Sequence, residues 1–311
     1  MNTPLATSTT DGIAPLPHLG LIRARGADAV KFLQGQLTND VAGMGLSQAR
    51  LAGFCTAKGR LQASFIVWKL ADDELLLVCA ASVLPATLKR LSMFVLRAQC
   101  KLTDASAELT LLGATGTSAT ELVGDAPAWG VRAATGGTAV RLPDVDGVPR
   151  ALLAVVPANA PAAGLSADVW RLLDVRSGIP TIEVATVEQF VPQMLNYELI
   201  GGVDFQKGCY PGQEIVARSQ YRGTIKRRMF LFECDALAQP GQEIFHSGDA
   251  SQPAGMVVNA APMAGTGSVA LVEVKLAALD TGSLHLASVD GATLRPTALP
   301  YTVPHDTALP A

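Results

Sequence analysis

The stretch DFQKGCYPGQEIVARSQYRG, residues 204–223, combines a thiol with a tight turn. Cys209 follows Lys207 and Gly208, and Pro211 favours the start of a helix directly afterwards. A neighbouring cation and the positive end of a helix both favour the thiolate form of cysteine. A functional thiol explains this pattern, and so does a compact side chain in a glycine-lined turn. The spacing alone leaves both interpretations open.

The composition indicates a soluble protein with a large core. The chain has 311 residues, of which 49% are hydrophobic, so we expect two domains or one domain with a smaller module. The net charge of −3 argues against bulk electrostatic binding of nucleic acid or of an anionic membrane. The sequence contains no uninterrupted apolar run of about 18 residues, so no membrane span is expected. Its polar start, MNTPLATSTTDG, lacks the features of a secretory signal.

The five cysteines and four histidines fit neither a disulfide framework nor a metal site. No two cysteines form a Cys-x-x-Cys pair, and their number is odd. The histidines lie far from the cysteines and from one another, so we expect no bound metal. These observations predict a cytoplasmic protein with reduced thiols, and a monomer is the simplest expectation.

Hydrophobic spacing predicts an α+β organisation for the first two thirds of the chain. Residues 26–40 have the spacing of a short amphipathic helix, and residues 60–80 form two strand-like runs around a polar turn at 71–74. Helical spacing follows over 82–99 and again over 166–178. Two strands followed by a helix are typical of an α+β layer rather than of a doubly wound parallel sheet. Residues 104–165 show little periodicity.

The last third of the chain has a different character. Short strand-like runs alternate with Gly, Pro and Asp, with no helical stretch, which predicts a small antiparallel barrel. We therefore expect three segments: a flexible N-terminus over 1–14, a mixed α+β region over 15–225 and a C-terminal β-barrel over 226–311.

The full motif KGCYPGQEIVARSQYRG is far more specific than its parts. It resembles the signature of the YgfZ family, folate-binding proteins related to the aminomethyltransferase (T protein) of the glycine cleavage system. FLQGQLTNDV, TAKGRLQASFIVW and the lead-in DVRSGIP…EQFVPQMLNYE…GGVDFQKGC resemble other family segments in the same order, so the resemblance covers about residues 15–230. It implies a T-protein-like folate-binding fold, with two interleaved α+β domains around a central opening and a C-terminal antiparallel β-barrel.

The resemblance also implies a thiol site and a site for tetrahydrofolate or a one-carbon-substituted form of it. Cys209 is expected to be the active thiol, supported by Lys207. The expected folate contacts are Asn39, Arg176, Gln193, Asn196, Tyr197, Arg218 and Arg222. Amide side chains both donate and accept hydrogen bonds, as a pterin edge requires, and the two last arginines suit the glutamate tail or a protein partner. Capping and turn formation explain Asn39, Gln193, Asn196 and Tyr197 equally well.

The implied function is an accessory role in the assembly or repair of iron–sulfur enzymes, including one that modifies tRNA. The alternative is aminomethyl or other one-carbon transfer of the T-protein type. Ala63 and Ser64 stand where the T protein has acidic residues, and Arg176 stands where it has a pterin-binding glutamate. A transferase therefore needs another carboxylate, for which Asp40 and Glu198 are the candidates. A third interpretation is RNA binding through the basic residues of 218–228, which the acidic net charge disfavours.

Overall fold

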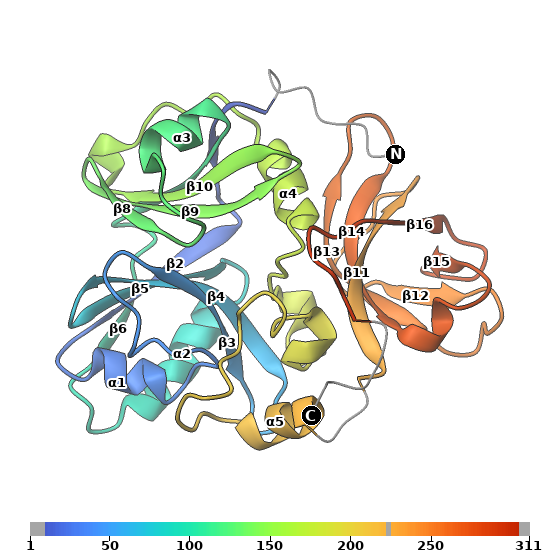
Figure 1. Cartoon of the computed structure of the whole chain (residues 1–311), viewed down its shortest axis with the longest axis horizontal. Helices are drawn as coiled ribbons and strands as arrows, with labels where there is room; N and C mark the ends of the chain where they lie inside the picture. The colour runs from blue at the N-terminus through green and yellow to red at the C-terminus, as the bar shows by residue number, and fades with distance from the viewer. Residues whose placement is uncertain (1–9, 222–224, 305–311) are drawn as a thin grey trace.

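The computed structural model describes residues 10–221 and 225–304 and contains three β-sheets (Figure 1). Two are open five-stranded sheets, and the third is a closed barrel of six strands. Short 3₁₀ turns occur at Pro157–Asn159, Val184–Thr186, Pro192–Leu195 and Leu276–Ala278. The expected α+β fold with a C-terminal antiparallel barrel is therefore confirmed.

The first sheet has the strand order β3-β4-β5-β2-β6. Its strands are β2 (Leu19–Arg25), β3 (Ala49–Cys55), β4 (Leu61–Ala71), β5 (Glu74–Ala80) and β6 (Lys101–Asp104). Strands β4 and β5 form the expected hairpin around the polar turn. Helices α1 (Ala29–Gln34) and α2 (Leu84–Val95) bury Phe32, Leu33 and Leu91 against this sheet, because their apolar residues recur at helical spacing.

The second sheet has the order β1-β7-β10-β9-β8. It comprises β1 (Gly12–Pro15), β7 (Thr110–Thr115), β8 (Val131–Ala134), β9 (Gly137–Val145) and β10 (Val148–Val155), with α3 (Thr117–Val123) nearby. Six of the eight residues of β10 form a continuous buried run at its end, so this strand shows no apolar–polar alternation. That burial explains why the sequence between 104 and 165 lacks a clear period. Strand β1 joins this sheet although the whole first sheet follows it in the chain.

The barrel contains β11 (Arg227–Cys234), β12 (Glu243–His246), β13 (Gly255–Pro262), β14 (Ser268–Lys275), β15 (Leu284–Leu286) and β16 (Thr293–Thr297). Antiparallel pairing of β11 with both β14 and β16 closes it. Closure leaves no unpaired sheet edge, which suits a set of short strands.

Helix α4 (Ala167–Arg176) lies between the second sheet and the barrel (Figure 1). Ser166 caps its start by accepting the backbone N–H of Asp168, as the sequence predicts. Trp170 packs into the core beneath the second sheet, whereas Leu172 and Val175 belong to a cluster shared with the barrel. The chain then passes through irregular turns to α5 (Gln213–Tyr221), which follows the thiol-bearing turn.

Candidate functional site

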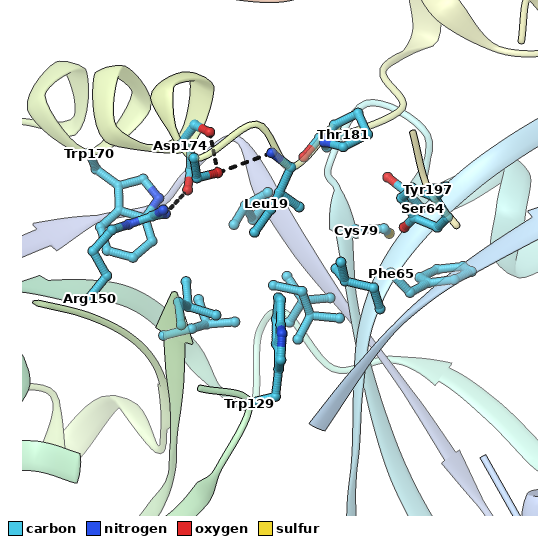
Figure 2. Close-up of a pocket in the computed structure, with 18 residues that line it drawn as sticks. Leu19, Ser64, Phe65, Cys79, Trp129, Arg150, Trp170, Asp174, Thr181 and Tyr197 are labelled. Atoms are coloured by element: carbon cyan, nitrogen blue, oxygen red, sulfur yellow. Dashed lines mark hydrogen bonds and ion pairs between the residues drawn. The ribbon is translucent and has the colours of Figure 1, made fainter. Parts of the chain in front are cut away.

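A pocket lies where the two open sheets and α4 meet (Figure 2). Its walls are mostly apolar, and its polar groups are few, as is typical of sites for small organic molecules. The side chains that carry its chemistry are Ser64, Trp129, Arg150, Trp170, Asp174, Thr181 and Tyr197. We call this space the central pocket.

An ion pair between Arg150 of β10 and Asp174 of α4 forms one side of the central pocket. The guanidinium lies 4.8 Å from the ring centre of Trp170, and its Nη1 donates to the main-chain carbonyl of Leu173 at 3.4 Å. Burial lowers the pKa of Arg150 and raises the pKa of Asp174, and the opposite charge of each partner counteracts the other's shift. The arginine is therefore fixed from several sides and holds the carboxylate in place.

Trp129 reaches the central pocket from a strained backbone position (Figure 2). Its φ of 67° is a conformation that a bulky residue rarely adopts. Two main-chain hydrogen bonds of 2.7 Å, one to Arg141 and one from Ala49, hold it there. Such strain persists where the surrounding structure imposes it, and it is concentrated at functional sites.

Apart from Tyr197, which was among the expected folate contacts, sequence reasoning missed the side chains that carry the chemistry of this pocket. A lone arginine within the otherwise apolar run VPRALLAV was the available signal, because a buried strand tolerates an arginine only when a partner is present. Nothing local marks Trp129, whose position depends on contacts with distant strands.

A second cavity of about 360 Å³ adjoins the central pocket and shares Leu19, Asp174, Ile179 and Thr181 with it. We call it the outer cavity. Burial, with a smaller effect of the Arg171 charge, lowers the pKa of His18 on its wall to about 4, so this imidazole is neutral at pH 7. Asp174 lies at the junction of the two cavities.

The thiol-bearing turn lies apart from both cavities. The Nζ of Lys207 donates to the main-chain carbonyls of Gln34 and of Leu37, the latter at 2.6 Å, and lies 5.1 Å from the ring centre of Tyr210. Burial lowers the pKa of Lys207 to about 8, although nearby acidic groups oppose this shift. Cys209, next to this anchored lysine, is exposed.

The other four cysteines are less accessible. Cys55, Cys79 and Cys234 are buried, and Cys100 is half-buried. Burial raises the pKa of Cys55 and of Cys79 to about 12, which disfavours their thiolates. Cys209 is therefore the thiol that a partner molecule reaches most easily.

The four predicted contacts in the interior use their polar groups mainly within the protein. The amide of Asn39 donates to two main-chain carbonyls at 2.6 Å, and those of Gln193 and Asn196 each donate to one at 2.7 Å. Tyr197 lines the central pocket, and burial raises the pKa of its hydroxyl, which donates to a main-chain carbonyl at 3.3 Å. The role of these four residues in folate binding stays a prediction.

Two of the three predicted arginine contacts, Arg176 and Arg218, are described by the structure, and neither lines the central pocket. Arg176 forms ion pairs with Asp146 at 2.9 Å and Glu233 at 3.5 Å, beside the barrel. Arg218 is exposed on α5, and Arg222 falls outside the described residues. Their role as ligand contacts likewise stays a prediction.

Two absences apply to residues 10–221 and 225–304. No three His, Cys, Asp or Glu side chains gather there to hold a metal ion. Within the same ranges, none of the helices has the length and apolar character needed to cross a membrane.

Comparisons with known proteins agree with this architecture. Residues 5–147 match the family described as "GCVT N-terminal domain". The solved glycine cleavage system aminomethyltransferase T from Bartonella henselae superimposes with a TM-score of 0.72 at 15% identity, covering 97% of this chain and 88% of that one. The fold is thus that of the T-protein class.

Sequence relatives define the family within that class. The tRNA-modifying protein YgfZ of Sodalis glossinidius is 31% identical over 317 residues, covering 93% of this chain and 92% of that protein. The YgfZ of Edwardsiella ictaluri is also 31% identical, covering 70% of each chain, and that of an Escherichia coli strain is 29% identical, covering 96% and 94%. This chain belongs to the YgfZ family.

Proposed function

We propose that this protein is a tetrahydrofolate-binding accessory factor that supports the assembly or repair of iron–sulfur enzymes, including one that modifies tRNA. Membership of the YgfZ family supports the proposal, since its relatives are named as tRNA-modifying proteins. The observation that carries it is the exposed Cys209 beside the anchored Lys207, separate from the enclosed pocket. In this proposal the protein acts in the cytoplasm as a monomer, with iron–sulfur proteins as its clients.

The thiol-bearing turn suits contact with a partner. An exposed thiolate can act as a nucleophile, as a redox group or as a transient ligand of iron. A stable cluster normally needs several cysteine ligands, and the remaining cysteines of this chain are buried or half-buried. We therefore assign Cys209 a transient role on a client rather than the permanent binding of a cluster.

The outer cavity and the adjoining central pocket together suit the folate, and the central pocket alone, at about 50 Å³, is smaller than a usual small-molecule site. Their walls combine aromatic and aliphatic side chains with a few polar groups, and the outer cavity of about 360 Å³ falls within the range of roughly 300–1,000 Å³ for small-molecule sites.

The alternative, aminomethyl or other one-carbon transfer, has weaker support. Asp40 accepts from Gln34 at 3.0 Å and lies 3.3 Å from Arg50, and Glu198 forms an ion pair with Arg228 in which both side chains are 5% exposed. Neither carboxylate lines the central pocket. Transfer of an aminomethyl group from a lipoate carrier by the purified protein would restore this alternative.

RNA binding through the basic residues has less support still. Arg228 is buried in its ion pair with Glu198, and Arg227 forms an ion pair with Glu273. A steep fall of RNA affinity with salt would support this interpretation against the accessory role.

Complementation tests the role of the thiol. In a strain that lacks the gene, we expect wild-type protein and Cys100→Ala to restore tRNA modification and iron–sulfur enzyme activity, whereas Cys209→Ala does not. Full restoration by Cys209→Ala contradicts the proposed role.

Calorimetric titration tests folate binding separately. We expect wild type and Cys209→Ala to bind tetrahydrofolate equally, because Cys209 lines neither cavity. Failure of the folded wild type to bind removes the folate from the proposal.

A further inference from the structure

A third cavity, of about 330 Å³, lies where the main chain joins the two open sheets. An isolated β-bridge pairs Gln48 with Gly130 there, and the N–H of Val131 donates to the carbonyl of Ser47 at 2.9 Å. We call this space the bridge cavity. One of its walls leads into β3 and the other into β8, and main-chain hydrogen bonds hold the two walls together.

The charged side chains on the wall of the bridge cavity are both basic. They belong to Arg50 and Arg132, and Ser47 and Gln48 add a hydroxyl and an amide. Among the described residues that line this cavity, none has a carboxylate. By contrast, the central pocket and the outer cavity both contain carboxylates. In a protein whose net charge is −3, the bridge cavity therefore attracts an anion rather than a cation.

Arg50, the second residue of β3, has donors to spare on its guanidinium. Its contacts with Asp40 both use Nη1, which donates to the main-chain carbonyl and lies 3.3 Å from the carboxylate Oδ2. Its Nε and Nη2 have no hydrogen-bond partner in the part of the chain that the structure describes. These two nitrogens form one edge of the planar guanidinium, and such an edge donates to two oxygens of one anion. Asp40 itself does not line the cavity.

Arg132, on the wall that β8 supplies, is held only by a surface ion pair. Its Nη2 lies 3.5 Å from a carboxylate oxygen of Asp125, and the two side chains are half exposed and fully exposed. Ion pairs of this kind contribute little, because water competes for both partners. Asp125 does not line the cavity either. An anion in the bridge cavity can therefore use both guanidiniums.

The charge and the number of donors favour a phosphate over a carboxylate. A phosphomonoester has three terminal oxygens and a charge of roughly −1.5 to −2 at pH 7, whereas a carboxylate has two oxygens and a single charge. Two arginines, an amide and a hydroxyl supply donors from both walls, which suits the larger and more highly charged group.

We propose that the bridge cavity binds the phosphate group of a small phosphomonoester, with Arg50 and Arg132 as its charged contacts. Ser47, Gln48 and Arg132 are exposed, so the rest of such a molecule extends into solvent. Trp129, whose ring points into the central pocket in Figure 2, also lines the bridge cavity. The site goes beyond the proposed function and depends on neither Cys209 nor folate binding. The protein binds the phosphate there, and no covalent step is assigned.

Calorimetric titration of the full chain with glycerol 3-phosphate at low ionic strength tests this proposal, with glycerol as the ligand that lacks the phosphate. We expect wild type to bind glycerol 3-phosphate with a Kd below about 1 mM and not to bind glycerol. Arg132→Gln should weaken this binding by about 10-fold or more, the effect of losing a hydrogen bond to a charged group.

Arg50→Lys is the second variant, chosen because it keeps a positive charge beside Asp40 and so protects the fold. We expect it to weaken binding by about 10-fold or more as well, since a lysine cannot form the two-donor edge. Arg295→Gln is the matched control, because Arg295 likewise forms an exposed ion pair, with Asp235 at 2.7 Å, and lines none of the three cavities. We expect it to bind like wild type.

Two results would overturn the site itself: a wild-type Kd above about 1 mM, or equal binding by wild type, Arg132→Gln and Arg50→Lys. Two further titrations test the ligand. Tighter binding of citrate than of glycerol 3-phosphate would make the site one for carboxylates. Tighter binding of a single-stranded RNA without terminal phosphates, through the same arginines, would assign the site to the RNA backbone and refute the phosphomonoester. Tetrahydrofolate binding and complementation by Cys209→Ala are measured separately, so the proposed function can fail while this site stands, and the reverse.

Discussion

Gly113 of β7 provides a quantitative test of how the central pocket is built. A Cβ at this position would lie 2.2 Å from Cε3 of Trp170 and 2.5 Å from two further ring atoms. An ordinary contact begins at 3.4 Å, so in Gly113→Ala the indole must retreat by about 1.2 Å. Trp170 is 1% exposed and lies against the Arg150 guanidinium, which leaves the ring little free space.

Overpacking of this kind costs about 1–3 kcal/mol of unfolding free energy. At roughly 2–4 °C per kcal/mol, the value for chains of 150–250 residues, we expect the Tm of Gly113→Ala to fall by about 2–12 °C. Because the displaced ring also supports the ion pair with Asp174, tetrahydrofolate binding should weaken as well.

Thermal unfolding followed by circular dichroism, together with tryptophan fluorescence, measures this effect. Gly164→Ala is the matched control, because a Cβ at Gly164 meets nothing within 4 Å and its φ lies outside the positive range that favours glycine. A Tm of Gly113→Ala within about 1 °C of the control, with unchanged fluorescence, would refute the packing described for Trp170.

Three further predictions concern charge and thiol chemistry. Arg228→Met leaves Glu198 buried and unpaired, so urea unfolding should show a loss of about 3–5 kcal/mol; a loss below about 1 kcal/mol contradicts the buried ion pair. Cys209 should react with a thiol reagent well before the other cysteines in the native protein, and an equally fast second thiol counts against the exposure described. The pKa of Lys207 is about 8 in the folded protein and 10.5 without burial, so the unfolded chain binds more protons between these pH values. The unfolding free energy of wild type should therefore rise relative to Lys207→Met from pH 8 to 10.5, and a flat difference over that window rejects the shift.

Local patterns in the sequence determined several elements of this protein. The polar turn between two apolar runs predicted the β4–β5 hairpin, and Ser166 predicted the start of α4. Regular turn signals after residue 226 predicted the barrel. These features depend on neighbours within a few residues, so a reading of the chain alone finds them. The signature around Cys209 indicated the family, which the sequence relatives confirm.

Only the tertiary structure decided which side chains face the central pocket. Trp129, Arg150 and Asp174 come from a loop, a strand and a helix, and the spacing of none of them predicts that they meet. Asp174 and Arg176 show the physical reason. Side chains two positions apart on an α-helix point in directions that differ by about 200°. Asp174 therefore faces the pocket, while Arg176 forms its ion pairs beside the barrel. The sequence determines the order of residues on α4, and the packing of the sheets and barrel around α4 decides which of its faces lines the site.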